Sequence, residues 1–371
     1  MRIYRISYRL RGVILALMFL TIAFSTLAQT GGNDCGQLNR AECQQVDASL
    51  SLTRDLNAAA FDAEIVLTIR DVYTRAFSTL RVFLDGAYRL NDDRNSSDPV
   101  IAVRGLDADV SVVVDLSELD PTGGLYNDLP AEEYAFDLSL LDGIGYINLS
   151  KLVGDDVREA DWYGIDLGAL IQLSLNSLGD LGSADLLPPV NNNSANSAPA
   201  LPFELEPTDV QRLSDVTVND VAMERYLWIV DFGTLLDDTF SRMTFNASML
   251  TILDAYLQGQ NYSDAELREI IDNYAQVLDV MSLRVERVIN PVDSTIHRVT
   301  YSFAYQPTDS LLDTLYYGLD PLGLGSTASD IYLDVTINRT QFDGDFALTA
   351  PENAILLTLF DLLPLLEDAN L

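Results

Sequence analysis

Hydrophobic and polar residues alternate over residues 331–338. The apolar positions are Ile331, Leu333, Val335 and Ile337. A period of two predicts a β-strand with one buried face and one solvated face. Asp343 and Gly344 follow, a pair that favours a tight turn, so we expect a hairpin to a second strand at residues 346–349. Residues 355–366 are almost continuously apolar and predict a helix after the sheet.

Similar β-rich runs recur along the chain and are separated by short polar joints. They predict strands at residues 61–72, 79–90, 100–103, 109–116, 134–141, 145–149, 161–167, 283–289 and 297–305. Residues 216–232 predict two more strands that meet at Asn219 and Asp220. Short joints favour neighbouring antiparallel strands. The pattern therefore predicts an α+β protein with one large antiparallel sheet and helices against it.

Helices are expected at residues 167–178, 234–258, 263–281 and 311–324. Ser263 and Glu266 form a capping box for the third of these helices. Its apolar residues make one stripe: Leu267, Ile270, Ile271, Tyr274, Leu278 and Met281. Residues 185–207 are rich in Pro, Asn, Ser and Ala. We interpret them as a flexible insertion in a single domain spanning residues 61–371, with a linker between two domains as the alternative.

The N-terminus has the features of an export signal. Four arginines precede an uncharged apolar run over residues 13–27, and small residues end it. This pattern predicts cleavage after Ala28 and a protein that acts outside the cytoplasm. An uncleaved membrane anchor is the alternative. Residues 29–60 then form an N-terminal segment before the domain.

The formal net charge is −34, and removal of the four arginines with the signal would make it −38. Such a surface repels nucleic acid and anionic lipid headgroups, so phosphate-backbone binding is excluded. The acidity is interpreted as a solubilising coat. Weak calcium sites are the functional alternative, with candidates at Asp115, Glu118, Asp120 and Asp128. None of the four lies in a spaced ligand loop, and no metal or cofactor is expected.

Cys35 and Cys43 are the only cysteines. In an oxidising compartment a pair eight positions apart predicts a local disulfide. A lipid-attachment cysteine requires small residues immediately before it, and Asn33 and Asp34 do not meet that requirement. A metal-binding pair is disfavoured because the chain has one histidine.

The order of elements over residues 61–353 resembles the LolA-like superfamily of bacterial envelope proteins, particularly the LppX/LprG-type lipoproteins and their exported relatives. The resemblance rests on Tyr146-Ile147, residues 162–166 (WYGID), residues 213–219 (LSDVTVN) leading into a long strand, and the closing run from Val335 to Pro351. It implies a strongly curved antiparallel sheet, a half-barrel, with helices packed on its concave face. It also implies a lipid or another apolar ligand held between sheet and helices.

The candidate ligand-binding residues lie on two predicted strands and on the third helix. They are Tyr226, Trp228, Val230 and Phe232, then Val299, Tyr301 and Phe303, and finally Ile270, Tyr274 and Leu278. A filled core would have the same composition as a ligand-lined cavity, so a non-catalytic surface or cell-wall-associated structural protein is the alternative function. Expected partners are a hydrophobic small molecule and no nucleic acid. We expect a monomer, and peripheral association with the cell envelope stays open.

Enzymatic function is not expected. His297 has no partner motif, and the chain carries no nucleophile elbow, zinc-protease motif, phosphate loop or dinucleotide fingerprint. Adjacent acids such as Asp237 and Asp238 would point to opposite faces of a strand or lie solvated in a loop.

Overall fold

The computed structural model of the chain describes residues 35–71, 77–96, 98–118, 133–148, 150, 161–169, 171–172, 209–233, 263–317 and 329–357. The predicted signal peptide, the insertion at residues 185–207 and the helix at residues 234–258 lie outside them. The strands are β1 (Ala58–Asp71), β2 (Phe77–Leu90), β3 (Leu106–Asp115), β4 (Glu133–Leu141), β5 (Ile144–Asn148), β6 (Trp162–Asp166), β7 (Asp209–Val218), β8 (Val221–Asp231), β9 (Met281–Ile289), β10 (Ile296–Tyr305), β11 (Ser329–Thr340) and β12 (Ile355–Leu357). The helices are α2 (Arg40–Asp55), η1 (Asp92–Asn95), α3 (Pro99–Ala102), η2 (Val103–Gly105), α6 (Asp264–Leu278) and α7 (Asp309–Tyr317).

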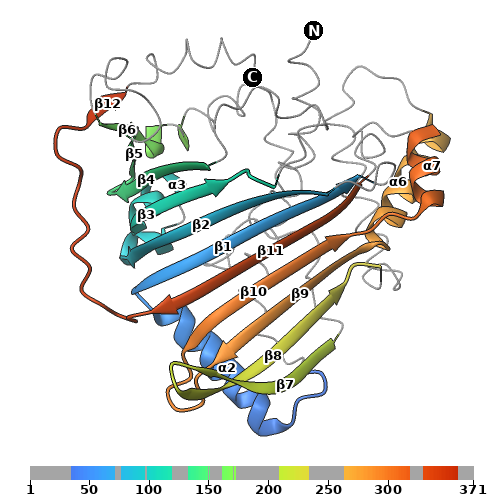
Figure 1. Cartoon of the computed structure of the whole chain (residues 1–371), viewed down its shortest axis with the longest axis horizontal. Coiled ribbons are helices and arrows are strands. Elements are labelled where there is room, and N and C mark those ends of the chain that lie inside the picture. Colours follow the sequence, from blue (N-terminus) through green and yellow to red (C-terminus); the bar gives the residue numbers. More distant parts are fainter. Residues whose placement is uncertain are drawn as a thin grey trace.

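All twelve of these strands belong to one sheet, in the order β12-β6-β5-β4-β3-β2-β1-β11-β10-β9-β8-β7 (Figure 1). Every neighbouring pair is antiparallel except β12 and β6. Strands that follow one another along the chain are mostly neighbours in the sheet, as the short joints predicted. The central pair, β1 and β11, instead joins the two ends of the described chain. The predicted α+β class with one large, mainly antiparallel sheet is confirmed.

Two of the predicted hairpins form at turns whose residues accept positive φ. Asp142 and Gly143 join β4 to β5 with φ of 48° and 77°, and Asn219 and Asp220 join β7 to β8 with φ of 50° and 62°. Positive φ at both central residues matches the twist of the flanking strands. Asparagine, aspartate and glycine tolerate this conformation best, so these turns fix the register of both hairpins.

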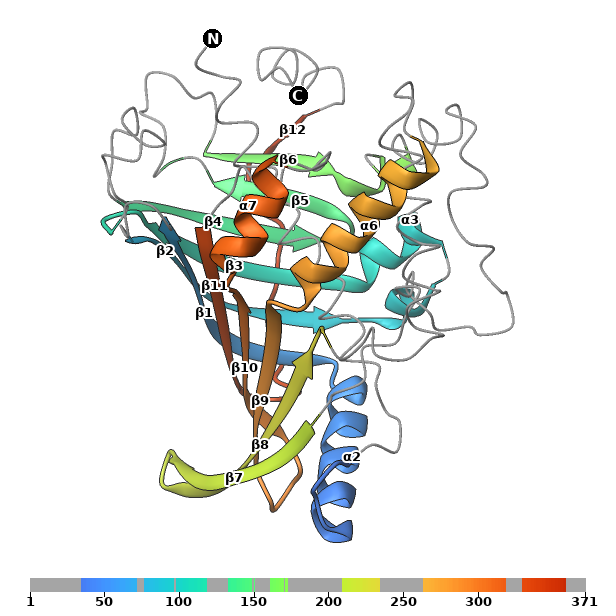
Figure 2. The same ribbon diagram turned by 90° about the vertical axis from the view of Figure 1, so that its right-hand side faces the viewer.

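The sheet is broad and open, and the expected strong curl into a half-barrel is wrong. β7 and β12 remain as edges, while the strands at the two ends of the sheet run in different directions (Figure 2). This arrangement follows from the right-handed twist that accumulates between neighbouring strands. Strong curvature needs repeated bulges or glycine kinks. Within the described pairs, the register shifts only between Leu213 and Val216 and between Ile296 and Arg298.

The three longer helices, α2, α6 and α7, pack on the same side of the sheet. Val46 of α2 belongs to a core cluster with residues of β7 to β10, and Ile270 of α6 packs with Leu311 of α7 and Tyr305 of β10. The capping box of α6 is confirmed, because the Ser263 backbone N–H donates to Glu266 Oε2 at 2.7 Å. The predicted amphipathic helix therefore packs near the start of β9, the end of β10 and the start of β11.

After β11, one expectation is wrong and a second is wrong over its first three residues. Residues 346–349 form no strand, because β11 is already paired on both sides, by β1 and β10. The turn at Asp343 instead closes the start of β1: its N–H donates to the Ala58 carbonyl at 2.8 Å, and its Oδ1 accepts the Asn57 N–H at 3.1 Å. The apolar run expected to begin a helix at residue 355 begins with β12, which pairs in parallel with β6. Residues 358–366 lie outside the described chain.

The strand expected at residues 100–103 is also wrong, since this segment forms α3 and η2. Asp98 precedes Pro99, and Asp98 Oδ1 accepts the Val100 N–H at 2.9 Å. An acidic N-cap followed by proline at the first helical position starts a helix even when the residues after it favour strands.

Candidate functional site

The two faces of the sheet differ sharply in polarity, and we call them the apolar face and the polar face. Directly paired residues point to the same side of a sheet. One such row crosses eight strands of the apolar face and consists of Trp228, Val285, Tyr301, Val335, Ile65, Val82, Val114 and Tyr134. The alternate positions carry charged and polar residues, such as Glu64, Glu286 and Thr336. The helices α2, α6 and α7 lie on the apolar face.

Burial along this row falls from one end to the other. Val285 is 0% exposed and Trp228 is 6% exposed, whereas Ile65, Val82 and Val114 are only half-buried. β1, β2 and β3 are interior strands, so neighbouring strands already protect their edges. Their aliphatic side chains stay partly accessible, and within the described residues the helices α2, α6 and α7 pack against β7 to β11 instead of over these strands.

The candidate residues of β8 and β10 meet in one core cluster under α2. Tyr226 and Val230 are fully buried, Trp228 and Val299 nearly so, and Phe232, Tyr301 and Phe303 pack against them. The candidate helix residues Ile270 and Leu278 lie in a second cluster, around α6 and α7. Phe303 packs against both clusters and against a third one, around Leu333 and Val335 of β11. The side chain of Tyr274 lies outside the described part of α6.

Arg287 lies within the apolar face and was not among the predicted site residues. It is 5% exposed, and its guanidinium lies 4.3 Å from the centre of the Trp228 ring. The pKa of Arg287 is lowered to about 10, chiefly by burial; Tyr301 opposes the shift, and the charge of Arg339 adds to it. The sequence carries a signal for this position, since Arg287 shares the parity of Val285 and Ile289 in β9.

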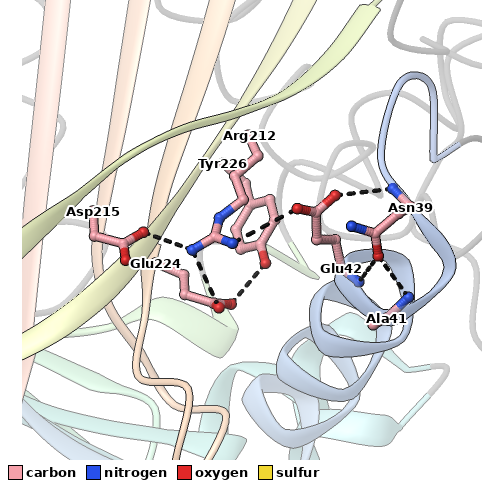
Figure 3. A network of polar contacts seen from close by, with 7 residues as sticks. All are labelled: Asn39, Ala41, Glu42, Arg212, Asp215, Glu224 and Tyr226. Carbon is pink, nitrogen blue, oxygen red and sulfur yellow. Dashed lines mark hydrogen bonds and ion pairs between the residues drawn. The ribbon is translucent and has the colours of Figure 1, made fainter.

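A polar network fixes the start of α2 to the β7–β8 hairpin (Figure 3). Arg212 forms ion pairs with Asp215 at 2.6 Å, Glu224 at 3.3 Å and Glu42 at 3.6 Å. Burial opposes the charged form of Arg212, but the hydrogen bond to Asp215 and the nearby carboxylates raise its pKa overall. The Tyr226 hydroxyl donates to Glu224 Oε2 at 2.7 Å. Burial first, and then this hydrogen bond, raise the pKa of Tyr226.

The predicted disulfide between Cys35 and Cys43 is present, with a Cα–Cα distance of 5.5 Å. It ties the segment before α2 to the first turns of that helix. Asn39 caps the same helix, and its Oδ1 accepts the N–H groups of Ala41 and Glu42. The disulfide and the polar network therefore hold α2 over β7 and β8.

The single histidine lies at the rim of the sheet. The His297 ring contacts Phe342 edge-on, with 5.0 Å between ring centres. Burial lowers the pKa of His297, and the charge of Asp293 partly opposes that shift. Asp237 and Asp238 lie outside the described residues. Within the described ranges, no group of three or more His, Cys, Asp or Glu residues is arranged to hold a metal ion, and no helix is long and apolar enough to cross a membrane.

No family model matches this chain, and none of the curated proteins matches its sequence. Among solved structures, the chain is similar to LprF from Mycobacterium bovis, with 9% identity, a TM-score of 0.30, and coverage of 83% of this chain and 95% of that one. It is also similar to the Mycobacterium tuberculosis lipoprotein LppX, with 10% identity, a TM-score of 0.31, and coverage of 84% and 100%. A DUF1329 family protein from Desulfovibrio piger follows, with 9% identity, a TM-score of 0.16, and coverage of 82% and 94%.

Proposed function

We propose that the chain is an exported, extracytoplasmic binding protein that holds a lipid or another apolar ligand on the apolar face of the sheet. The observation that carries the proposal is the incomplete burial of aliphatic side chains on interior strands, at Ile65, Val82 and Val114. An alkyl chain laid over such residues gains about 0.8 kcal/mol for each methylene removed from water. Interior strands of a filled core would not leave this surface to solvent.

The location outside the cytoplasm is supported by the N-terminal sequence and by the disulfide between Cys35 and Cys43. Disulfides persist in oxidising compartments and are rare in the cytosol. The ligand would lie beside the cluster of Tyr226, Trp228 and Val230 rather than within it, because these three side chains are already packed. Tyr301 and Phe303 are half-buried and border both regions. No catalytic step is part of this proposal.

The proposal is tested by native mass spectrometry and solvent extraction of the purified protein, with a matched pair of variants. Val82 and Phe83 are neighbours in β2 that point to opposite faces, and Phe83 is 39% exposed on the polar face. Val82→Asp places a charge where the alkyl chain would lie, whereas Phe83→Asp leaves that surface unchanged. We expect the wild-type protein and Phe83→Asp to retain lipid and Val82→Asp to lose it. Equal retention by both variants would contradict the proposed site.

A structural role with a filled core is the second candidate, and the packing under α2 favours it. Val230, Val285 and Ile289 are fully buried and Leu283 is 1% exposed, so this half of the apolar face has no room for a guest. If the whole face were filled in solution, the purified protein would carry no lipid and take up none when it is offered. Uptake measured with a fluorescent fatty-acid probe separates the two candidates.

A further inference from the structure

The apolar face contains two arginines in a region that is otherwise without charge. Among the described side chains that point to this face from β9, β10, β11 and β1 to β4, Arg287 and Arg339 are the only charged ones. Arg339 follows Val335 and Ile337 at the same parity in β11. Arg287 is buried and Arg339 is half-buried. Placing arginines among aliphatic side chains is costly, so two of them on one apolar face require an explanation.

Of the two arginines, Arg339 has a side-chain nitrogen without a hydrogen-bond acceptor in the part of the chain that the structure describes. Its Nη1 is buried and has no hydrogen-bond partner within the described residues. A buried charged donor without an acceptor is one of the most costly polar defects in a folded protein. Arg287 is close enough for the charge of Arg339 to lower its pKa. The two guanidinium groups therefore repel each other in a region of low polarity.

The chain has many carboxylates that could have paired with Arg339. It contains 56 acidic residues against 22 basic ones, and arginines elsewhere in the sheet use them. Arg225 forms a two-point ion pair with Glu286 at 2.9 and 2.8 Å, and Arg89 pairs with Asp107 at 2.7 Å. In the part of the sheet formed by β9, β10, β11 and β1 to β4, however, all described carboxylates point to the polar face. An acceptor for Nη1 of Arg339 must therefore come from outside this part of the sheet.

We propose that Arg339 binds the oxyanion head of a single-chain amphiphile, a carboxylate or a phosphate, whose alkyl chain lies over Ile65 and Val82, while the charge of the buried Arg287 adds to the attraction. Guanidinium groups match both oxyanions in geometry and charge. A head group at Arg339 would give the buried Nη1 its acceptor and relieve the repulsion between the two arginines. The adjacent half-buried aliphatic row provides the surface for the chain. This inference rests on the proposed function and specifies the chemical class of its ligand.

Three ligands with the same alkyl chain test the proposal on the full-length mature protein: oleate, oleyl phosphate and oleyl alcohol. Binding is measured by isothermal titration calorimetry below the micellar concentrations, after solvent extraction of any bound lipid. We expect the wild-type protein to bind at least one oxyanion about tenfold or more tightly than the alcohol, which is the size expected for a buried charge-assisted hydrogen bond. The comparison of oleate with oleyl phosphate identifies which head group the arginines prefer.

Arg339→Met should remove most of this selectivity while leaving affinity for the alcohol nearly unchanged. The matched control is Arg298→Met, on the neighbouring strand but on the polar face, where Arg298 Nε donates to Asn338 Oδ1 at 2.7 Å. We expect the control to retain wild-type selectivity. If Arg339→Met does not fold by circular dichroism, the wild-type ratio of oxyanion to alcohol affinity still decides the question.

The outcomes separate this inference from the proposed function. Binding of none of the three ligands would refute the proposed function and the inference together. Equal binding of all three by the wild type, or unchanged selectivity in a folded Arg339→Met, would overturn the inference and leave the apolar site standing. Selectivity lost equally in Arg298→Met would show a general charge effect and would also overturn it.

Discussion

Replacing Tyr226 with phenylalanine removes one hydroxyl from the core and leaves the ring in place. The side chain is 0% exposed, and its hydroxyl donates to Glu224 Oε2 at 2.7 Å. Hydrogen bonds to charged groups contribute about 1.5–3 kcal/mol net, so we expect Tyr226→Phe to lower the free energy of unfolding by about 2 kcal/mol at pH 8. Glu224 keeps Arg212 as a partner, which holds the loss near the lower part of that range.

This loss should shrink in alkali, and the direction follows from the raised pKa of Tyr226. The folded protein keeps the phenol protonated because burial, and then the hydrogen bond to Glu224, raise its pKa. In the unfolded chain the same phenol ionises near pH 10. The stabilisation is therefore complete below pH 10 and is lost as pH rises toward the folded-state pKa, by about 1.4 kcal/mol for each pH unit. Between pH 8 and pH 11 the difference between wild type and variant should fall to roughly 0.6 kcal/mol.

Urea unfolding followed by tryptophan fluorescence at pH 8, 10 and 11 measures this difference directly. The chain has 17 tyrosines, and subtracting the variant from the wild type removes the contribution of the other 16. Tyr332→Phe is a suitable control, because its hydroxyl lies on the polar face, where it accepts from Gln306 Nε2 at 2.6 Å and donates to Asp330 Oδ2 only at 3.4 Å. A stability difference for Tyr226→Phe that stays constant from pH 8 to pH 11 would refute the reasoning.

Three further predictions concern stability. His297 is the only histidine, and burial lowers its pKa. Its neutral form therefore stabilises the fold above pH 6.5, and this contribution is lost as pH falls through the folded-state pKa. We expect His297→Phe to flatten the dependence of the free energy of unfolding in urea on pH between pH 7 and pH 5, and an unchanged dependence would contradict this. Replacing Cys35 and Cys43 with serine should cost about 2–3 kcal/mol through loop entropy, and dithiothreitol should lower the Tm of the wild type but not of the double variant. Leu283→Ala, at a side chain 1% exposed, should cost about 3–5 kcal/mol in urea unfolding, and a loss below 1 kcal/mol would show a loosely packed core.

Much of the sheet could be predicted from alternation and turn chemistry. The paired turn residues Asn219 and Asp220 placed the turn between β7 and β8 correctly, although β7 begins at Asp209, before the predicted strand. The capping box at Ser263 placed α6. These signals are local, because each turn or cap depends on residues within a few positions of itself. The helix α2 was not expected, although Asn39 and Glu42 form a capping box of the same kind at its start.

The errors arose where distant parts of the chain decide the structure. The turn at Asp343 has the sequence of a hairpin, but β1 had already occupied the free edge of β11. Ile355 begins an apolar run that resembles a helix, and it pairs with Tyr163 of β6 instead. Alternation identified the apolar face, but it could not show that Trp228 is packed while Val82 stays half-buried, since helix placement decides that difference. Arg339 was overlooked because it lies at the end of an apolar strand, where a charge is usually solvated.

The pairing of β1 with β11 has a consequence for how the chain reaches its final state. Arg70 and Asp330, an ion pair across these two strands, are 260 residues apart in the sequence. Before β11 is made, one edge of the fourteen-residue strand β1 has unpaired backbone groups, and such an edge can pair with other newly made chains. Contacts of such long range also slow folding. We therefore expect the yield of refolding to depend on dilution and on any partner that shields this edge before β11 pairs with it.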